Sequence, residues 1–219
     1  MRVLVFGDSN SWGYSPDGVG RRLERQVRWP GVFAQATGVE LIEEALPGRT
    51  TRYDDPLMRP PAAYNGLAHF ETILLSHTPV DVVLIMLGTN DLKNRFEPSS
   101  TKIAENLAVL AAVAQGCPCG GENWQTEQMP RVGVIVPPPL GSLAFDKAWP
   151  RYAEWSQGAD VGQSLKSAVQ ARFSGSDIPV FAAADHIESS AIDPIHLDPQ
   201  SHQILGSAVA SWFNANFAR

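Results

Sequence analysis

Residues 81–87, Asp-Val-Val-Leu-Ile-Met-Leu, constrain the fold of this chain more than any other segment. The run has the length of a strand, and after its first residue it is apolar without alternation. Strands of this kind are typical of the middle of a parallel sheet, where helices cover both faces. Polar residues follow at once, because the next four residues, 88–91, are Gly-Thr-Asn-Asp.

Four further segments have the pattern of strands, and helical patterns separate them. The predicted strands are residues 3–6, 39–45, 81–87, 131–136 and 178–183. Predicted helices begin near Trp29, after the caps Asn65, Ser99 or Ser100, and Asp198, and a further helix ends near Phe173. This alternation predicts an α/β fold: three α/β/α layers around a five-stranded, parallel, doubly wound, flavodoxin-like sheet. With 44% hydrophobic residues, we expect residues 1–219 to form a single domain.

The charge balance argues against several classes of partner. Seventeen Lys and Arg stand against 23 Asp and Glu, so we expect no nucleic-acid partner. Arg21, Arg22, Arg25 and Arg28 cluster around Glu24, which favours a solvated or intersubunit loop over a phosphate-binding patch. No run of about eighteen apolar residues would span a membrane. Because the first predicted strand starts so close to the first residue, we expect a cytoplasmic protein without a signal peptide.

The two cysteines do not predict a metal site. Cys117 and Cys119 stand in a Cys-Pro-Cys sequence, which offers two ligands where a structural zinc ion needs four. We expect free thiols in a polar insertion of residues 117–130. We also expect no metal ion and no organic cofactor.

Small and polar residues follow four of the five predicted strands. Right-handed crossovers would place these loops at one edge of the sheet, where ligands bind in open α/β folds. The residues concerned are Ser9, Gly48, Asn90 and the pair Asp193 and His196. Taken alone, Gly-Asp-Ser at residues 7–9 would also suit a turn or a helix N-cap, and Asn90 would suit a turn. The coincidence of all four at one edge favours a functional site.

Acyl transfer needs this set of side chains. A serine hydroxyl is a weak nucleophile, so Ser9 requires a base, and we predict His196 in that role. Asp193, three residues earlier, can orient the imidazole and stabilise its charged form. The backbone N–H groups of Ser9 and Gly48 and the side-chain amide of Asn90 are the predicted oxyanion donors. Glycine at position 48 permits close approach of the backbone.

Two alternatives remain for the base and the acid. His186 follows the last predicted strand and competes with His196 as the base. Asp198 competes with Asp193 as the acid, although its place before Pro199 is better explained as a helix cap.

Four sequence blocks resemble the SGNH (GDSL-type) hydrolase family. They are GDSN at residues 7–10, LPGRT at 46–50, GTND at 88–91 and DPIHLD at 193–198, in the family's order across essentially the whole chain. The resemblance implies the SGNH hydrolase fold. No Gly-x-Ser-x-Gly is present, which argues against the nucleophile elbow of α/β-hydrolases.

The family blocks fall on Ser9, Gly48, Asn90 and His196, and the resemblance implies Asp193 as the acid. Pro194 departs from the family pattern, because the Asp-x-x-His block usually has glycine there. Proline fixes φ and lacks an N–H, which puts the geometry of the acid in question.

Several segments look most like the arylesterase/acyltransferase branch of this family. They are GDSNSWG, VRWPGVFAQ, IEEALPGRTTRYDDP, LIMLGTNDLK and PPPL. This branch implies a serine esterase acting on short-chain acyl and aryl esters of small molecules, some acyl transfer to alcohols, and a homo-oligomer. Alternatives are a carbohydrate acetyl esterase or a lysophospholipase/thioesterase. A rival from another class is a non-catalytic flavodoxin-like domain that binds a phosphorylated ligand at residues 7–11.

We expect the substrate pocket to involve residues beside the nucleophile and the base. These are Asp8, Asn10, Trp12 and Ile195. Trp12 could equally be a core or interface aromatic. The irregular segments 14–28 and 51–64 are placed to cover the site.

Overall fold

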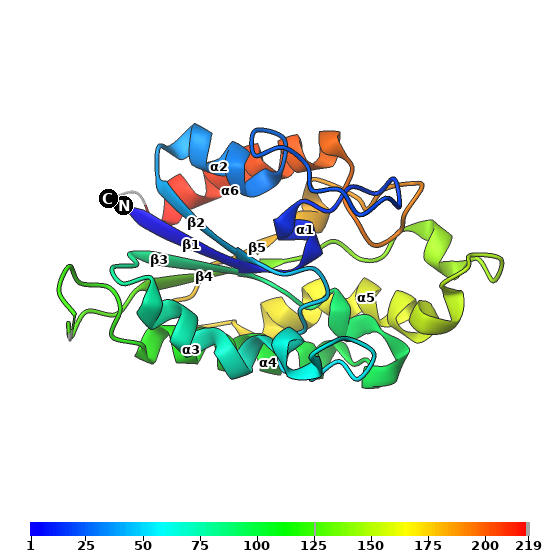
Figure 1. The fold of residues 1–219 in the computed structure, drawn as a ribbon, viewed down its shortest axis with the longest axis horizontal. Coiled ribbons are helices and arrows are strands. Elements are labelled where there is room, and N and C mark those ends of the chain that lie inside the picture. Colours follow the sequence, from blue (N-terminus) through cyan, green and yellow to red (C-terminus); the bar gives the residue numbers. More distant parts are fainter. Residues whose placement is uncertain (125, 218–219) are drawn as a thin grey trace.

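The computed structural model describes residues 1–124 and 126–217, and it contains one five-stranded parallel sheet (Figure 1). The strands are β1 (Arg2–Gly7), β2 (Glu40–Ala45), β3 (Val82–Met86), β4 (Arg131–Val136) and β5 (Val180–Ala182). Their order is β2-β1-β3-β4-β5, and every pairing is parallel. This is the flavodoxin-like order, so the predicted fold class is confirmed.

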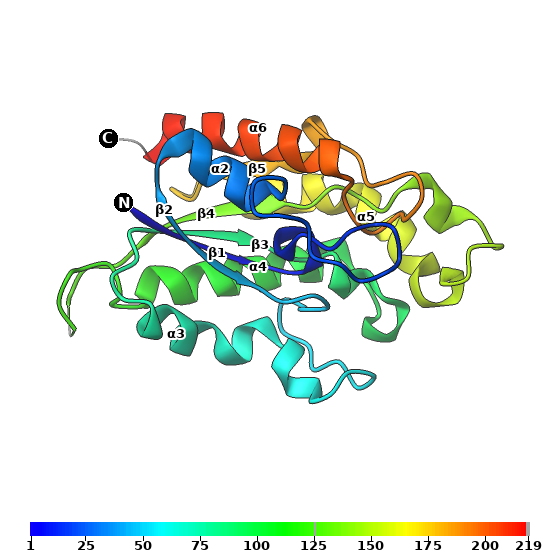
Figure 2. The ribbon, with the colours of Figure 1, turned by 45° about the horizontal axis from the view of Figure 1, so that its top comes forward.

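Helices cover both faces of the sheet. They are α1 (Ser9–Trp12), α2 (Trp29–Thr37), α3 (Gly66–Ser76), α4 (Ser100–Gly116), α5 (Tyr152–Arg172) and α6 (Pro199–Phe217). Short 3-10 helices span Pro61–Tyr64, Asn90–Leu92, Asn94–Phe96, Ser142–Phe145 and Ala183–Asp185. Figures 1 and 2 show α2 and α6 on one face and α3, α4 and α5 on the other. Within the described ranges, no helix has the length and apolarity needed to cross a membrane.

The central strand explains why its sequence is apolar without alternation. All five residues of β3 are buried, and the strand pairs with β1 on one side and β4 on the other. Val83 and Ile85 belong to the core under α3, α4 and α5, whereas Val82, Leu84 and Met86 belong to the core under α2 and α6. Both faces of the strand are therefore packed against helices.

The predicted helix caps are confirmed. The side chains of Asn65, Ser99 and Asp198 accept hydrogen bonds from the backbone N–H groups of Ala68, Lys102 and Ser201, at 3.2, 3.4 and 2.7 Å. Each cap satisfies a backbone donor that the first turn of its helix leaves unpaired.

The segment after β1 differs from the simple turn that its sequence also suited. Asp8 caps a four-residue helix, α1, by accepting the N–H of Asn10 at 2.9 Å. Ser9 is the first residue of this helix, and Gly13 ends it with a φ of 87°. The backbone N–H groups of Gly13 and Tyr14 both donate to the Ser9 carbonyl, at 3.0 Å each.

Two other expectations need correction. The last strand is shorter than residues 178–183, because Pro179 has no N–H to donate to the sheet. In the arginine cluster, Arg28 is not solvated: its side chain is buried and donates to both carboxylate oxygens of Glu43, at 2.6 and 2.8 Å. This pair ties the loop of residues 14–28 to β2. The prediction of free thiols in a loop agrees with the structure, where both cysteines are free and buried.

Candidate active site

The ends of β1, β2 and β3 meet at the carboxyl edge of the sheet. Gly7 pairs with Ala45 of β2 and with Met86 of β3, so the residues that follow these three strands emerge side by side. This is the point where the strand order reverses, the usual ligand position in such folds. Ser9, Gly48 and Asn90 follow these three strands.

Ser9, His196 and Asp193 form a continuous chain of contacts. The Oγ of Ser9 is 3.1 Å from Nε2 of His196, and Nδ1 of His196 is 2.6 Å from Oδ2 of Asp193. Ser9 and His196 are buried, with 3% and 7% of their surfaces exposed. A hydroxyl beside one imidazole nitrogen and a carboxylate beside the other is the arrangement that nucleophilic catalysis requires.

Pro194 is compatible with this geometry. Oδ1 of Asp193 accepts the N–H of Ile195 at 2.9 Å, which leaves Oδ2 to face His196. The carbonyl of Pro194 accepts the N–H of Gly141 at 2.8 Å, so the loop is also held from outside. The hydrogen bonds of this turn do not require an N–H group at position 194. Proline can therefore stand there while the Asp193 carboxylate stays within reach of the His196 imidazole.

The electrostatics keep Asp193 ionised. Burial alone would raise the pKa of its carboxyl, but the hydrogen bond and charge of His196 hold that pKa below its usual value. The alternative acid, Asp198, is occupied as the cap of α6. The alternative base, His186, stacks on Phe181 with ring centroids 5.0 Å apart, at the end of β5.

Asn90 and Gly48 are placed as potential oxyanion donors. Nδ2 of Asn90 donates to the carbonyl of Arg49 at 3.1 Å and lies 3.5 Å from Oδ2 of Asp8. Gly48 has a φ of 92°, a conformation that favours glycine. In the described part of the chain, no group accepts the backbone N–H of Ser9 or Gly48. These donors are therefore free for a ligand.

A buried network behind Asn90 was missed from the sequence. Asp91 accepts the backbone N–H and the hydroxyl of Thr51, and Asn106 donates to that hydroxyl at 3.0 Å. Burial raises the pKa of Asp91 to about 7, against the lowering effect of the Thr51 hydrogen bonds, and burial raises that of Asp8 to about 6. The network joins the loops after β2 and β3. In the sequence, Asp91 beside Asn90 could have indicated this network. Its hydrogen bonds with Thr51 cannot be recognised without the folded structure.

A groove of about 420 Å³ opens on the His196 side of the site. Tyr14, Trp149, Arg151 and Ile192 form much of its wall. The ring of Tyr14 stacks on the imidazole of His196, with centroids 4.3 Å apart and an interplanar angle of 23°. Sequence reasoning missed Trp149 and Arg151, because they lie in an irregular stretch without a pattern.

The predicted pocket residues lie elsewhere. Asp8 and Asn10 are each 1% exposed, and Ile195 is 3% exposed. None of the three forms part of the groove wall. Asp8 instead accepts the N–H of Asn10, and Nδ2 of Asn10 donates to the carbonyl of Ile195. Trp12 is half-buried and packs near Tyr14, at 6.3 Å between ring centroids.

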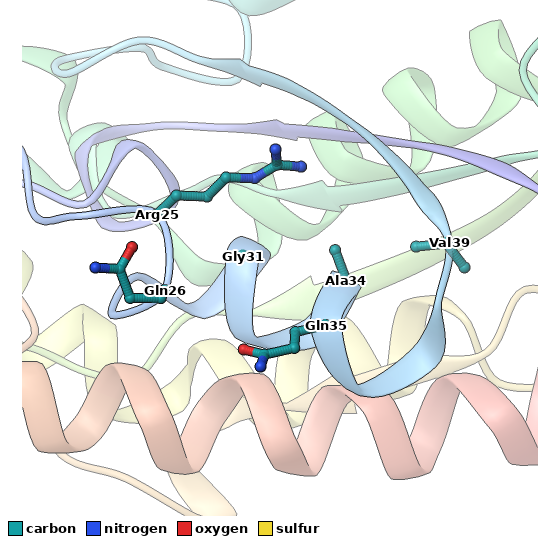
Figure 3. Close-up of a pocket in the computed structure, with 6 residues that line it drawn as sticks. All are labelled: Arg25, Gln26, Gly31, Ala34, Gln35 and Val39. Atoms are coloured by element: carbon teal, nitrogen blue, oxygen red, sulfur yellow. The ribbon is translucent and has the colours of Figure 1, made fainter.

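A second pocket lies on another part of the surface, between the loop before α2 and the start of β2 (Figure 3). It measures about 310 Å³ and is lined by Arg25, Gln26, Gly31, Ala34, Gln35 and Val39. These residues supply amides and one guanidinium but neither a nucleophile nor an acid. The chemistry is therefore concentrated at the carboxyl edge of the sheet.

Comparisons with known proteins show the family of this chain and its fold. The model of the GDSL-like lipase/acylhydrolase family matches residues 5–204. The native aryl esterase of M. smegmatis is 33% identical, with a TM-score of 0.89, and the alignment covers 99% of this chain and 100% of that one. A carbohydrate acetylesterase from Sinorhizobium meliloti is 34% identical, with a TM-score of 0.88 and the same coverage. No curated protein matches the sequence.

Proposed function

Because the chain belongs to the GDSL-like lipase/acylhydrolase family, we propose that it is a serine esterase that cleaves short-chain acyl and aryl esters. The observation that carries this proposal is the contact chain from Ser9 through His196 to Asp193. The reaction passes through an acyl-enzyme on Ser9. Its product is a carboxylic acid and an alcohol or phenol.

Each side chain of the contact chain has one task. His196 accepts the hydroxyl proton at Nε2 while Oγ of Ser9 attacks the ester carbonyl. Asp193 stabilises the imidazolium that forms, through the short contact at Nδ1. His196 then protonates the leaving oxygen, and in the second half of the reaction it takes a proton from the attacking water. These steps need no metal ion and no organic cofactor.

The developing oxyanion is stabilised by the backbone N–H groups of Ser9 and Gly48 and by Nδ2 of Asn90. These donors come from three neighbouring strand ends, so they are fixed before the substrate binds. Prearranged donors of this kind are typically worth about 3 kcal/mol each in the transition state.

The groove is the site of the leaving alcohol. Since His196 must reach the leaving oxygen, that part of the substrate lies on the His196 side of Ser9, where the groove opens. The aromatic walls of Tyr14 and Trp149 suit an aryl ring. They suit the apolar face of an acetylated sugar as well, which makes carbohydrate acetyl esterase activity the second candidate. An alcohol bound in the same groove can replace water as the acyl acceptor, which gives acyl transfer.

The proposal includes self-association and excludes nucleic acid and membranes as partners. Exposed apolar side chains surround the site on its loops: Val19 and Leu57 are each 74% exposed, and Ile192 is 70% exposed. A homo-oligomer would cover such side chains. Analytical ultracentrifugation of the purified protein tests this, and a monomer at micromolar concentration would contradict it.

Hydrolysis of p-nitrophenyl acetate tests the assignment of the nucleophile and the base. Ser9→Ala and His196→Ala should each lower kcat by about 10⁴-fold or more. Ser211→Ala and His69→Ala change exposed residues on α6 and α3 and should leave kcat unchanged. Substantial activity in either site variant would contradict the proposal. A wild-type protein without turnover of any ester would favour the phospholigand-binding alternative.

An acyl-length series distinguishes the substrate classes. Among p-nitrophenyl esters from acetyl to octanoyl, those with the shortest acyl chains should show the highest kcat/KM. The enzyme should also release measurable acetate from peracetylated sugars. A maximum at long chains would favour a lysophospholipase or thioesterase.

A further inference from the structure

One hydrogen bond joins the nucleophile segment directly to the loop that carries the base. Nδ2 of Asn10, the residue after Ser9, donates to the carbonyl of Ile195, the residue before His196, at 3.0 Å. We propose that Asn10 is a positioning residue, which sets the separation of the Ser9 hydroxyl from the His196 imidazole. This inference rests on the proposed function.

Further hydrogen bonds hold each of the two segments that this bond connects. On one side, the capped helix α1 fixes the backbone of Asn10 through its N–H to Asp8. On the other side, Asp193 holds the N–H of Ile195, and Ser190 donates to the carbonyl of His196 at 2.8 Å. A bond between two segments that are held in this way controls their spacing, and here the segments are 185 residues apart in sequence.

The bond is shielded from solvent. Asn10 is 1% exposed and Ile195 is 3% exposed, so water is not available to replace the amide if it is removed. The loop would have to shift before the carbonyl of Ile195 found another donor. Such a shift moves His196, because His196 is the next residue.

Packing in the core does not explain why an amide side chain stands at position 10. Oδ1 of Asn10 has no hydrogen-bond partner among the described residues, and burying an unpaired polar atom is unfavourable. An aliphatic side chain at position 10 would bury no unpaired polar atom. The donor function of the amide is therefore the feature that the asparagine adds.

Asn10 also differs from Tyr14, whose ring stacks on the imidazole of His196. Tyr14 lines the groove, so a change there alters substrate binding as well as the imidazole. Asn10 does not line the groove. A change at Asn10 should therefore affect kcat and leave KM alone.

The test compares Asn10→Leu and Asn10→Asp with the wild type, using p-nitrophenyl acetate. Asn10→Leu keeps the branched arrangement of heavy atoms, with larger methyl groups, and removes the donor. It should lower kcat and kcat/KM equally, by about 5-fold, the effect of one typical hydrogen bond. KM should stay within about 2-fold. Asn10→Asp has the same shape but sets an oxygen against the Ile195 carbonyl, so its loss should be larger. Asn216→Leu is the control, since it removes a donor to the Trp212 carbonyl far along α6 and should leave kcat unchanged.

Labelling by a p-nitrophenyl phosphonate separates positioning from folding. The rate of Ser9 modification should fall in Asn10→Leu by the same factor as kcat, while the final extent should reach one label per chain in every variant. If either Asn10 variant keeps the wild-type kcat and labelling rate, the inference is overturned, whatever happens to its melting temperature. If the wild type itself does not take the label on Ser9, the proposed function has failed instead.

Discussion

Asn90 is the residue that we propose as the side-chain donor to the oxyanion. Its Nδ2 is held at 3.1 Å from the carbonyl of Arg49, beside Gly48 and opposite Asp8. Asn90→Ala removes this donor and should lower kcat about 10²- to 10³-fold with little change in KM, because the oxyanion exists only in the transition state. Steady-state kinetics with p-nitrophenyl acetate checks this, and an equal rise in KM with unchanged kcat would assign Asn90 to ground-state binding instead.

The individual site residues were predictable to the extent that a local pattern marks them. Ser9, Asn90 and His196 each follow a predicted strand, and the structure places Ser9 and His196 within hydrogen-bond distance. The contact of Asn10 with Ile195 could not be predicted, since no local pattern records a partner 185 residues away. Its place beside Ser9 predicts a pocket residue, whereas Asn10 does not line the groove.

At the scale of elements, α5 supports the segment that presents Asn90. Gly158 of α5 lies against Leu92, and a Cβ at position 158 would be 1.8 Å from the Leu92 carbonyl oxygen. Gly158→Ala therefore forces the 3-10 helix Asn90–Leu92 away from α5. We expect a loss of about 1 to 3 kcal/mol in the free energy of unfolding, together with a lower kcat.

The control for this change is Gly116→Ala, at the end of α4, where a Cβ meets no atom within 4 Å. That variant should keep kcat. Urea unfolding and ester hydrolysis measure the two effects, and a Gly158→Ala enzyme with wild-type stability and kcat would show that α5 does not brace Asn90.

The elements were predictable where periodicity and caps mark them. The central strand and the caps Asn65 and Asp198 agree with the structure, because burial on both faces and unpaired N–H groups leave clear patterns. Helix α1 was not predicted as a helix, since four residues are too few to show a period. The start of α5 at Tyr152 was also not predicted, because its first turn has no side-chain cap.

At the scale of the whole molecule, the stability depends on a buried histidine between α2 and α6. Nδ1 of His202 accepts the backbone N–H of Trp29 at 3.2 Å, and burial lowers the pKa of His202 to about 4. Between about pH 6.5 and pH 4 the unfolded chain binds a proton at His202 that the native chain does not bind. Acidification through this window therefore lowers the free energy of unfolding, by about 1.4 kcal/mol per pH unit from this group.

Two buried carboxyls change the free energy of unfolding in the opposite direction, because through them acidification raises it. The pKa values of Asp8 and Asp91, raised to about 6 and about 7, mean that the native chain keeps protons which the unfolded chain releases. Comparing the wild type with His202→Gln cancels these contributions, since both proteins retain them. In urea unfolding, the wild type should lose about 3 kcal/mol relative to the variant between about pH 6.5 and about pH 4. A difference that stays constant with pH would contradict a neutral buried His202.

The overall topology separates the site from the rest of the surface. The start of β1, the end of α6 and residues 117–124 and 126–130 lie at one end of the molecule, on the left in Figure 1. The position of the site at one edge followed from strand alternation and the handedness of crossovers. The groove could not be predicted in this way, because its wall combines the loop after α1, an irregular stretch before α5 and the segment before α6.

The covalent intermediate is the most direct test of the account. During turnover of p-nitrophenyl acetate, rapid acid quenching followed by peptide mass mapping should find one acetyl group on the peptide that contains Ser9. Ser9→Ala should carry none. An acetyl group on a different residue, or turnover by the wild type with no acetylated peptide, would contradict an acyl-enzyme on Ser9.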